Sequence, residues 1–407
     1  MIILAWSNST TAQTAVAIER SINDVTFVQV ATVGGSATGF QDQGLFPSST
    51  YYYRIRALNG SSASPYTPVV PATTATPTWQ QVNPGLPAPT ARLNMGFTNA
   101  FNTNQMMVCA GDDGSSSPPT NTQTWALDYS GSPKWTQVGT GGSPGVRFNP
   151  GVSYSPGSQT FTGASNAVIL FGGYDGTPVL RNDVWTLKPA SPSAWAGPVV
   201  TAGTAPAGRL GSAVVMVGSK LFVIGGQTVA GFMNDLWILD FGSPTPFWTN
   251  PLVTSPMDPR AFHTAVFDPV NNQIVVFGGF DGANYRNDTW ALNLTGAPFW
   301  SLLTPTGIPP AARSNMTAVY NSAAQMMIVF GGNAVSGSEN DVWLLTLSGT
   351  PIWSPVLVDV FPSGTAPPGT RGSHAAIFDD AGSKMIIFGG QDFFSGIPYS
   401  DTWQLQF

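Results

Sequence analysis

The sequence predicts an all-β protein made of a short N-terminal region and a longer region of six repeats. Its apolar runs are only four to six residues long and are bounded by Gly, Pro and Asn. Such runs are typical of strands and are too short for helices. Gly (45 residues) and Pro (35 residues) are abundant, which suits many short strands joined by turns. Tryptophans recur at a regular spacing, which indicates a repeat.

The tryptophans define the repeats. Two of them, Trp79 and Trp403, stand without a partner at the two ends of the repeat region. The others in this region form pairs ten or eleven residues apart: Trp125/Trp135, Trp185/Trp195, Trp237/Trp248, Trp290/Trp300 and Trp343/Trp353. Trp79 follows Pro77 and Thr78, as the second tryptophan of four pairs also follows a proline by two positions. We therefore predict that Trp79 completes the repeat of Trp403, an arrangement that closes a ring.

Every repeat has the same order of features. An arginine opens it, two apolar runs follow, and the second run ends in a glycine doublet such as Gly278-Gly279, except in the first repeat, which has Gly111-Asp112. A polar loop then leads to Asn-Asp-x-Trp, as at Asn287 to Trp290, whereas the first repeat has Gln123-Thr124-Trp125 and the sixth has Ser400-Asp401-Thr402-Trp403. The opening arginines are Arg92, Arg147, Arg209, Arg260, Arg313 and Arg371. Four strands in a unit of roughly 50 to 60 residues match one propeller blade.

The glycine doublet, the tryptophan of the third strand and the second tryptophan resemble the kelch repeat family over about residues 77–407. The resemblance implies a six-bladed β-propeller with strand 77–83 closing the last blade. We expect the blades near 86–140, 141–203, 204–254, 255–306, 307–362 and 363–407. Closure removes exposed sheet edges, which otherwise invite aggregation.

Residues 1–76 have a different pattern, with strands expected at 15–20, 27–33 and 51–59. In the last of these, Tyr51, Tyr53 and Ile55 share one face, which marks a half-buried antiparallel strand. The stretch 44–51 resembles the fibronectin type III family, which implies a β-sandwich with Tyr51 as its corner tyrosine and Trp6 as its core tryptophan. The family has a strand ahead of that tryptophan, and we expect it to be cut away, absent or supplied by a neighbouring molecule.

Composition limits the classes of function. Charged residues make up 9% of the chain, the net charge is −6, and no basic run exists, so nucleic acid is a poor partner. No apolar stretch is long enough to predict a membrane span. Cys109 is the only cysteine and falls in an apolar run, where it fits a core position. From the two resemblances we expect an extracellular or cell-surface protein of a bacterium.

The six repeat arginines, with His263 and His374, are the candidate binding residues. If each arginine began an innermost strand, the guanidinium groups would line one mouth of the channel and bind carboxylates, sulfated glycans or an acidic peptide. The alternative, which we favour, pairs each arginine with a repeat aspartate inside the fold. Each histidine lies three residues after its arginine and fits a structural role better than a metal or base role.

The sequence predicts no catalytic residues and no cofactor. Only two histidines are present and no Cys/His/carboxylate cluster is visible, so copper-oxidase chemistry known on kelch folds is not carried over. The acidic turns at 112–114, 175–176 and 281–282 fit turn chemistry, with calcium as the alternative.

We therefore predict a non-enzymatic binding or structural protein. Its propeller loops would recognise protein or glycan ligands, and the N-terminal sandwich would allow self-association by strand donation, which would serve adhesion or the assembly of surface filaments. A carbohydrate-active enzyme of oxidase, mutarotase or lyase type at the channel mouth is the alternative.

Overall fold

The computed structural model describes residues 1–407 except 115–120, 139–140, 158, 190–192 and 361–365, and it confirms an all-β chain. The first of two compact units comprises Met1–Thr78 with Val356–Asp359 and Phe407, and the second comprises Trp79–Pro355 and Val360–Gln406. Two short 3-10 helices occur among the described residues, η1 (Phe101–Thr103) and η2 (Thr162–Ala164). No described helix has the length and hydrophobicity to span a bilayer.

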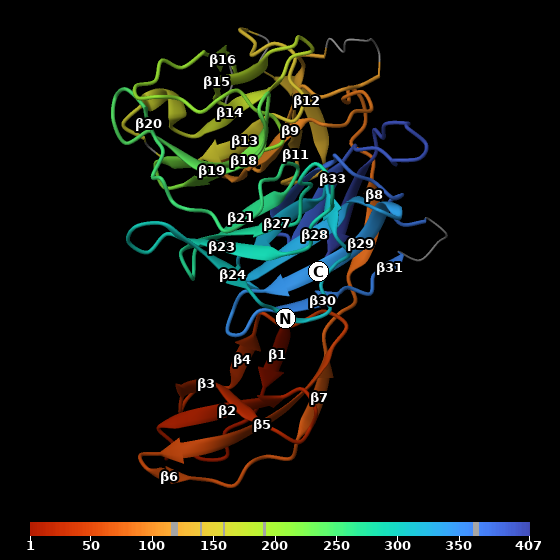
Figure 1. Ribbon diagram of the computed structural model, residues 1–407. Coiled ribbons are helices and arrows are strands. Elements are labelled where there is room, and N and C mark those ends of the chain that lie inside the picture. Colours follow the sequence, from red (N-terminus) through yellow and green to blue (C-terminus); the bar gives the residue numbers. More distant parts are fainter. Residues whose placement is uncertain (115–120, 139–140, 158, 190–192, 361–365) are drawn as a thin grey trace. The chain divides into compact units, whose positions relative to one another are not determined.

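The first unit contains two sheets, a pair β1-β4 and a sheet in the order β3-β2-β5, with β6 and β7 both pairing with β5 (Figure 1). The strands are β1 (Ile2–Ala5), β2 (Ala15–Ser21), β3 (Val28–Gly34), β4 (Gly39–Asp42), β5 (Thr50–Asn59), β6 (Ser62–Ala63) and β7 (Val70–Thr73). Trp6 is half-buried and packs against a core that contains Ile18, Tyr51 and Tyr53. The Tyr51 hydroxyl accepts a hydrogen bond from the Phe46 amide at 2.9 Å, which ties the start of β5 to the preceding loop.

The described part of the second unit contains six sheets, of which the first five are each built around four antiparallel strands taken in chain order. The first sheet contains β9 (Gly96–Ala100), β10 (Gln105–Cys109), β11 (Thr124–Asp128) and β12 (Lys134–Val138). The second contains β13 (Gly151–Ser155), β14 (Ala167–Tyr174), β15 (Leu180–Leu187) and β16 (Trp195–Ala196). The third contains β17 (Ala213–Val217), β18 (Lys220–Thr228), β19 (Gly231–Asp240) and β20 (Phe247–Thr249).

The fourth sheet contains β21 (Thr264–Asp268), β22 (Gln273–Phe277), β23 (Thr289–Asn293) and β24 (Phe299–Leu303). The fifth contains β27 (Thr317–Asn321), β28 (Met326–Ala334), β29 (Gly337–Thr346) and β30 (Ile352–Pro355), with the short strands β25 (Thr306–Gly307) and β26 (Arg313–Ser314). The sixth contains β32 (Ala375–Asp379), β33 (Lys384–Phe388) and β34 (Thr402–Gln406), followed in space by β8 (Thr78–Val82) and β31 (Asp359–Val360).

The first strands of the six sheets contact one another in a circular order. β9 packs against β13, β13 against β17, β17 against β21, β21 against β27, β27 against β32, and β32 against β9. The second strand of each sheet is almost wholly buried and apolar, as in Ile274 to Phe277 of β22. Strands with two buried faces are expected where sheets pack on both sides. We call the six sheets blades 1 to 6 in chain order.

The outer tryptophans join neighbouring blades. Each of three packs on the phenylalanine that precedes the glycine doublet of the preceding blade: Trp135 on Phe388, Trp248 on Phe171 and Trp353 on Phe277, with ring centroids 4.9–5.5 Å apart. Trp79 packs in the same way on Phe330 of blade 5, at 5.1 Å. It therefore has the contact expected of an outer tryptophan of blade 6, whose third strand, β34, lies next to β8.

Replacing Trp79 with alanine should lower the free energy of unfolding by about 3–5 kcal/mol, because the buried ring leaves a cavity against Phe330. Urea unfolding followed by tryptophan fluorescence measures this change. Phe247→Ala, at an exposed outer-strand position, is the matched control and should change the free energy by less than about 1 kcal/mol. Equal effects of the two substitutions would contradict a closing role for β8.

Candidate functional site

The six repeat arginines are inside the blades rather than at an open mouth. Their exposed fractions range from 0% to 4%. Of the two arrangements considered from the sequence, the solvent-facing ring of guanidinium groups does not match this burial, and the pairing inside the fold does. A buried charge requires a countercharge and hydrogen bonds, and the repeat aspartates and backbone carbonyls supply them.

Arg260 in blade 4 shows the arrangement in full. Its Nη1 and Nη2 donate to the two carboxylate oxygens of Asp288 at 2.5 and 2.8 Å, and Nη1 also donates to the Gly278 carbonyl at 3.0 Å. The same carboxylate accepts the indole N–H of Trp290 at 2.6 Å. The equivalent two-pronged pairs are Arg209–Asp235, Arg313–Asp341 and Arg371–Asp401.

Blades 1 and 2 depart from this arrangement. Arg92 has Gln123 in place of an aspartate, at 3.4 Å, and donates to the Ala110 carbonyl at 3.1 Å. Burial lowers the pKa of Arg92 to about 10, which still leaves it charged at neutral pH. Arg147 pairs with Asp183 through one nitrogen at 2.6 Å.

Three of the paired carboxylates, those of Asp288, Asp341 and Asp401, have a lowered pKa that favours the ionised form. Burial alone raises the pKa of Asp288, but the hydrogen bonds and charge of Arg260 and the Trp290 indole outweigh it, so the pKa lies below its usual value. The same opposing effects lower the pKa of Asp341 beside Arg313 and of Asp401 beside Arg371.

The backbone of the arginines also links consecutive blades. In each blade the residue that ends the glycine doublet, or its blade 1 equivalent Gly111, donates its N–H to the carbonyl of the next blade's arginine. The pairs are Gly111–Arg147, Gly173–Arg209, Gly226–Arg260, Gly279–Arg313, Gly332–Arg371 and Gly390–Arg92, at 2.8–3.1 Å. Gly278 and Gly279 have φ of 69° and 106°, in the region that favours glycine, so this approach explains the doublet.

His263 and His374 pack between neighbouring blades. His263 lies against Gly225 of blade 3, and His374 lies against Gly331 and the ring of Phe330 in blade 5. Burial, with the charge of Arg260, lowers the pKa of His263 to about 3, and burial with Arg371 lowers the pKa of His374 well below its usual value. The same position holds Met95, which lies against Gly389, and Met316, which lies against Gly278. Both histidines are therefore neutral packing residues at neutral pH.

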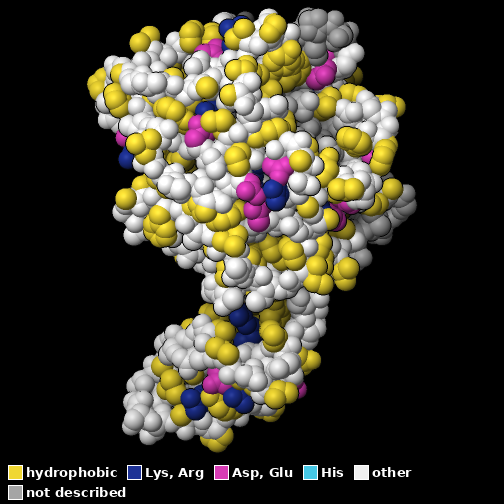
Figure 2. All heavy atoms as spheres, in the orientation of Figure 1, with side chains coloured by type: hydrophobic (Ala, Val, Ile, Leu, Met, Phe, Trp, Pro, Cys, Tyr) yellow, Lys and Arg dark blue, Asp and Glu magenta, His cyan; other side chains and the backbone are white. Residues whose placement is uncertain are grey.

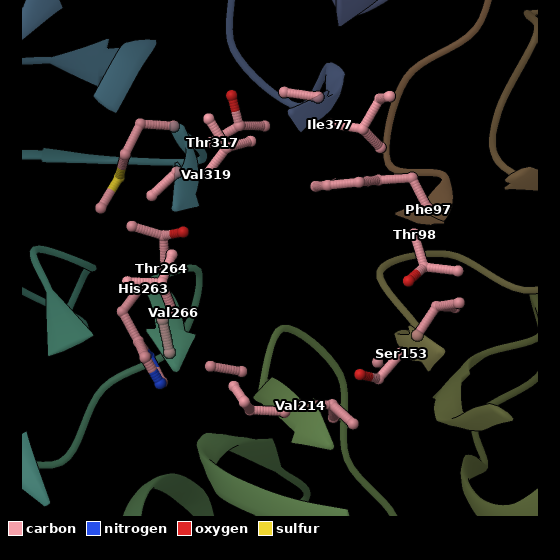
Figure 3. A pocket seen from close by; sticks show the side chains of 18 of the residues that line it. Phe97, Thr98, Ser153, Val214, His263, Thr264, Val266, Thr317, Val319 and Ile377 are labelled. Carbon is pink, nitrogen blue, oxygen red and sulfur yellow. The ribbon is translucent and has the colours of Figure 1, made fainter. Parts of the chain in front are cut away.

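A central cavity of about 400 Å³ lies among the six first strands. Figure 3 shows side chains of these strands around the open centre, among them Thr98, Ser153, Val214, Thr317 and Ile377. The described lining contains no Lys, Arg or Glu. Apolar and hydroxyl groups dominate this cavity, so it offers little to a charged ligand.

A second cavity of about 300 Å³, which we call the mouth, lies at the end of the first strands where the chain enters them. Its lining is Leu93, Asn94, Asn149, Phe262, Asn315, Asn333, Gly372, Ser373, Gln391 and Phe393. This lining includes five carboxamide side chains, one from glutamine and four from asparagines, and two phenylalanine side chains.

A closed series of backbone hydrogen bonds surrounds the mouth. The residue two positions after each repeat arginine has a left-handed φ of 47–63° and donates its N–H to the corresponding carbonyl of the preceding blade, at 2.7–3.2 Å. The six residues are Asn94, Asn149, Gly211, Phe262, Asn315 and Ser373. The series runs through all six blades and returns to its start, because Asn94 donates to Ser373. We call it the hydrogen-bonded circle.

The acidic turns are occupied by their own loops. Asp175 accepts hydrogen bonds from Thr177 and pairs with Arg181. Asp281 accepts the amides of Ala283 and Asn284 and pairs with Arg286. In the part of the chain that the structure describes, no three His, Cys, Asp or Glu side chains are grouped as a metal site. Calcium binding stays an untested prediction.

Comparison with known proteins assigns this architecture to a class of repeat proteins. A family model described as the KLHDC2/KLHL20/DRC7 kelch-repeats domain matches residues 149–255 and 244–407. This match covers more than half of the sequence, and the chain belongs to the kelch-repeat family. The solved structure titled "Structure of YjhT" has a TM-score of 0.56 and 16% identity, covering 79% of this chain and 96% of that one, which shows a shared fold.

Curated relatives are similar over part of this chain. A putative adagio-like protein 2 of Oryza sativa subsp. japonica is 30% identical over 239 residues, which is 56% of this chain and 37% of that protein. A leucine-zipper-like transcriptional regulator 1 homolog of Drosophila melanogaster is 27% identical over 241 residues, 57% of this chain and 24% of that protein. The chain thus spans well under half the length of these relatives.

These findings support a binding role and correct the expected location. Kelch-repeat proteins typically bind protein partners, in agreement with the predicted non-enzymatic role. The relatives come from rice, Drosophila and Chlamydomonas, and one is a dynein regulatory complex subunit. They are intracellular eukaryotic proteins, so the prediction of a bacterial extracellular or cell-surface protein is wrong.

Sequence reasoning missed the mouth residues. It selected positions with a shared side chain, the arginines, whereas Asn, Asn, Gly, Phe, Asn and Ser share only a backbone conformation. Four of these six residues are Asn or Gly, the types that tolerate the left-handed region well. Their recurrence two positions after the arginine in four of the six repeats was the available signal.

Replacing Asp288 with Asn should lower the free energy of unfolding by about 3–5 kcal/mol, because Arg260 would stay buried without its countercharge. Asp258→Asn removes an exposed partner of Arg286 and should cost less than about 1 kcal/mol. Since the pKa of Asp288 is lowered on folding, its contribution is present above about pH 4 and disappears as the pH falls through the folded pKa. Urea unfolding at several pH values should show that the difference in the free energy of unfolding between the wild type and Asp288→Asn becomes smaller in acid.

Replacing His263 with methionine, the residue of blades 1 and 5, should preserve the fold and flatten part of the pH dependence of stability. The wild-type imidazole has a folded pKa of about 3, below its unfolded value of about 6.5. Its stabilisation is therefore complete above about pH 6.5 and declines as the pH falls toward 3. Thermal unfolding between about pH 7 and 4 tests this. A melting temperature that depends on pH equally in the variant and the wild type would contradict it.

Proposed function

We propose that this chain is a protein-binding protein built as a closed six-bladed kelch propeller, with β8 as the closing strand of blade 6. Three observations support closure: β32 packs against β9, Gly390 donates to the Arg92 carbonyl, and the hydrogen-bonded circle passes through every blade. We also propose that residues 1–76 form a fibronectin type III-like sandwich. The sheet order of the first unit and the Tyr51–Phe46 hydrogen bond support it.

The observation that carries the binding role is a set of exposed apolar side chains on the loops between second and third strands. Phe393, Phe394 and Ile397 of blade 6 and Val335 of blade 5 are 58–89% exposed. Phe393 also lines the mouth, and Phe394 lies against Gly337 of the blade 5 loop. We call these four residues the loop patch. Adjacent exposed aromatic and aliphatic groups mark protein-binding surfaces, because their burial favours association.

The charge distribution agrees with partner recognition by apolar and hydrogen-bonding groups. On the face shown in Figure 2, most charged side chains stand in small groups that contain both signs. Glycan recognition and self-association remain predictions from the sequence, as does the enzyme alternative. The structure gives the enzyme alternative little support, because both histidines are buried between blades.

Replacing Phe394 with Asp should weaken partner binding at least about tenfold, because a charge would replace the exposed ring at the centre of the loop patch. Val270→Asp is the matched control, since Val270 is also exposed but lies in the turn at the opposite end of its blade. Both variants should keep the wild-type melting temperature.

The measurement uses the full chain with a photo-cross-linking amino acid at position 394 or at position 270, in an extract of the source cells. Cross-links to a defined partner should form at 394 and be competed by wild-type protein but not by Phe394→Asp. Equal cross-linking at both positions would refute the loop patch as the binding surface.

A further inference from the structure

Phe262 has an unusual backbone for its side chain. Its φ is 59°, in the left-handed region, where an aromatic residue is disfavoured because its Cβ crowds the backbone. The hydrogen-bonded circle imposes this conformation. The Phe262 N–H donates to the Gly211 carbonyl at 2.7 Å, and the Phe262 carbonyl accepts from Asn315 at 2.9 Å.

The strained position places the Phe262 ring over Gly211. A Cβ on that glycine would come within 2.7 Å of the ring, so only glycine leaves room for it. The ring is half-buried and lines the mouth. Because the circle uses backbone atoms, an asparagine, as in three other blades, would keep the circle with less strain. Strained residues concentrate at functional sites, so the aromatic face is a candidate ligand contact.

The mouth also offers free hydrogen-bonding groups. The side-chain carboxamides of Asn94 and Asn149 make no hydrogen bond to any described residue, although both line the mouth. Each carboxamide supplies two donors and one acceptor oxygen. That combination matches a peptide group, which has one donor and one acceptor.

No charged side chain is among the residues that line the mouth within the described chain. The repeat arginines are buried: those of blades 2 to 6 are paired with aspartates, as Arg260 is with Asp288, and Arg92 is bonded to Gln123 and the Ala110 carbonyl. A charged ligand group would therefore lose its hydration without gaining a countercharge, which is costly. A mouth lined in this way is expected to disfavour acidic, basic and phosphorylated segments.

We propose that the mouth binds an uncharged segment of the partner protein. An apolar or aromatic side chain of that segment rests on the Phe262 ring, and its peptide groups bond to the carboxamides of Asn94 and Asn149. This inference rests on the proposed function and specifies the chemistry of the segment that enters beside the loop patch.

The first test selects short random peptides from a display library on the whole purified chain. Selected peptides should lack charged residues in their common core and contain an apolar or aromatic residue there. Their affinity should change less than about twofold between about 50 and 500 mM NaCl, since no ion pair is screened. A core rich in Asp, Glu, Lys or Arg, or a tenfold loss of affinity in salt, would overturn the inference. So would binding of neutral oligosaccharides in place of peptides.

The second test compares variants with a selected peptide. Asn94→Ala/Asn149→Ala and Phe262→Asn should each weaken binding at least about tenfold, whereas Phe262→Tyr keeps an aromatic face and should retain affinity. Phe299→Ala, an exposed aromatic on an outer strand, is the control and should bind as the wild type does. Phe262→Asn should melt within about 2 °C of the wild type, because relieved strain offsets the lost ring contacts. Full affinity of Phe262→Asn would overturn the inference.

The outcomes separate this inference from the proposed function. If native-partner cross-links at position 394 depend on Phe394 but survive Phe262→Asn and Asn94→Ala/Asn149→Ala, the loop patch stands and the mouth inference fails. If no cross-links form at position 394, the proposed function fails first.

Discussion

The buried arginine of each blade is the interaction on which the second unit depends. A guanidinium group removed from water must have a countercharge and acceptors close by. In blades 3 to 6 the aspartate two positions before the third-strand tryptophan provides the charge, the first glycine of the doublet provides a carbonyl, and the indole N–H donates to the same carboxylate. Three separate motifs of the repeat are thus one cluster. Their spacing in the sequence follows from the strands that bring them together.

The same arginine connects its blade to the one before it. Its carbonyl accepts the N–H of the preceding blade's second glycine, and that contact needs a backbone conformation that a side chain would obstruct. Two positions later, the circle around the mouth makes another inter-blade bond. The arginine side chain forms its hydrogen bonds within its own blade, and the arginine backbone forms hydrogen bonds to the neighbouring blade. The arginine therefore has no group left for a ligand. Recognition then falls to residues that the repeat does not constrain.

The sequence was sufficient for the parts of the fold that rest on side-chain chemistry. The tryptophan spacing predicted the repeats, and Trp79 packs on Phe330 as three outer tryptophans pack on their phenylalanines, a contact that agrees with the proposed closure. Pairing of the arginines with aspartates was also foreseen as one of two interpretations. The mouth was not foreseen, because its residues are related through φ and backbone hydrogen bonds rather than through a shared side chain. The predicted extracellular location was wrong because it was inferred from domain resemblance, and neither composition nor residue spacing indicates where a protein is located.

The shortage of charge links structure to recognition. Charged residues are 9% of the chain, and many of them are already used inside the fold: the repeat arginines with their aspartates, and the turn aspartates with Arg181 and Arg286. Ion pairs within a blade stabilise that blade and leave little net field outside it. A surface of this kind cannot rely on long-range attraction for partner choice. If the proposed binding role holds, specificity would come from shape, apolar contact and carboxamides, the groups that line the mouth and make up the loop patch.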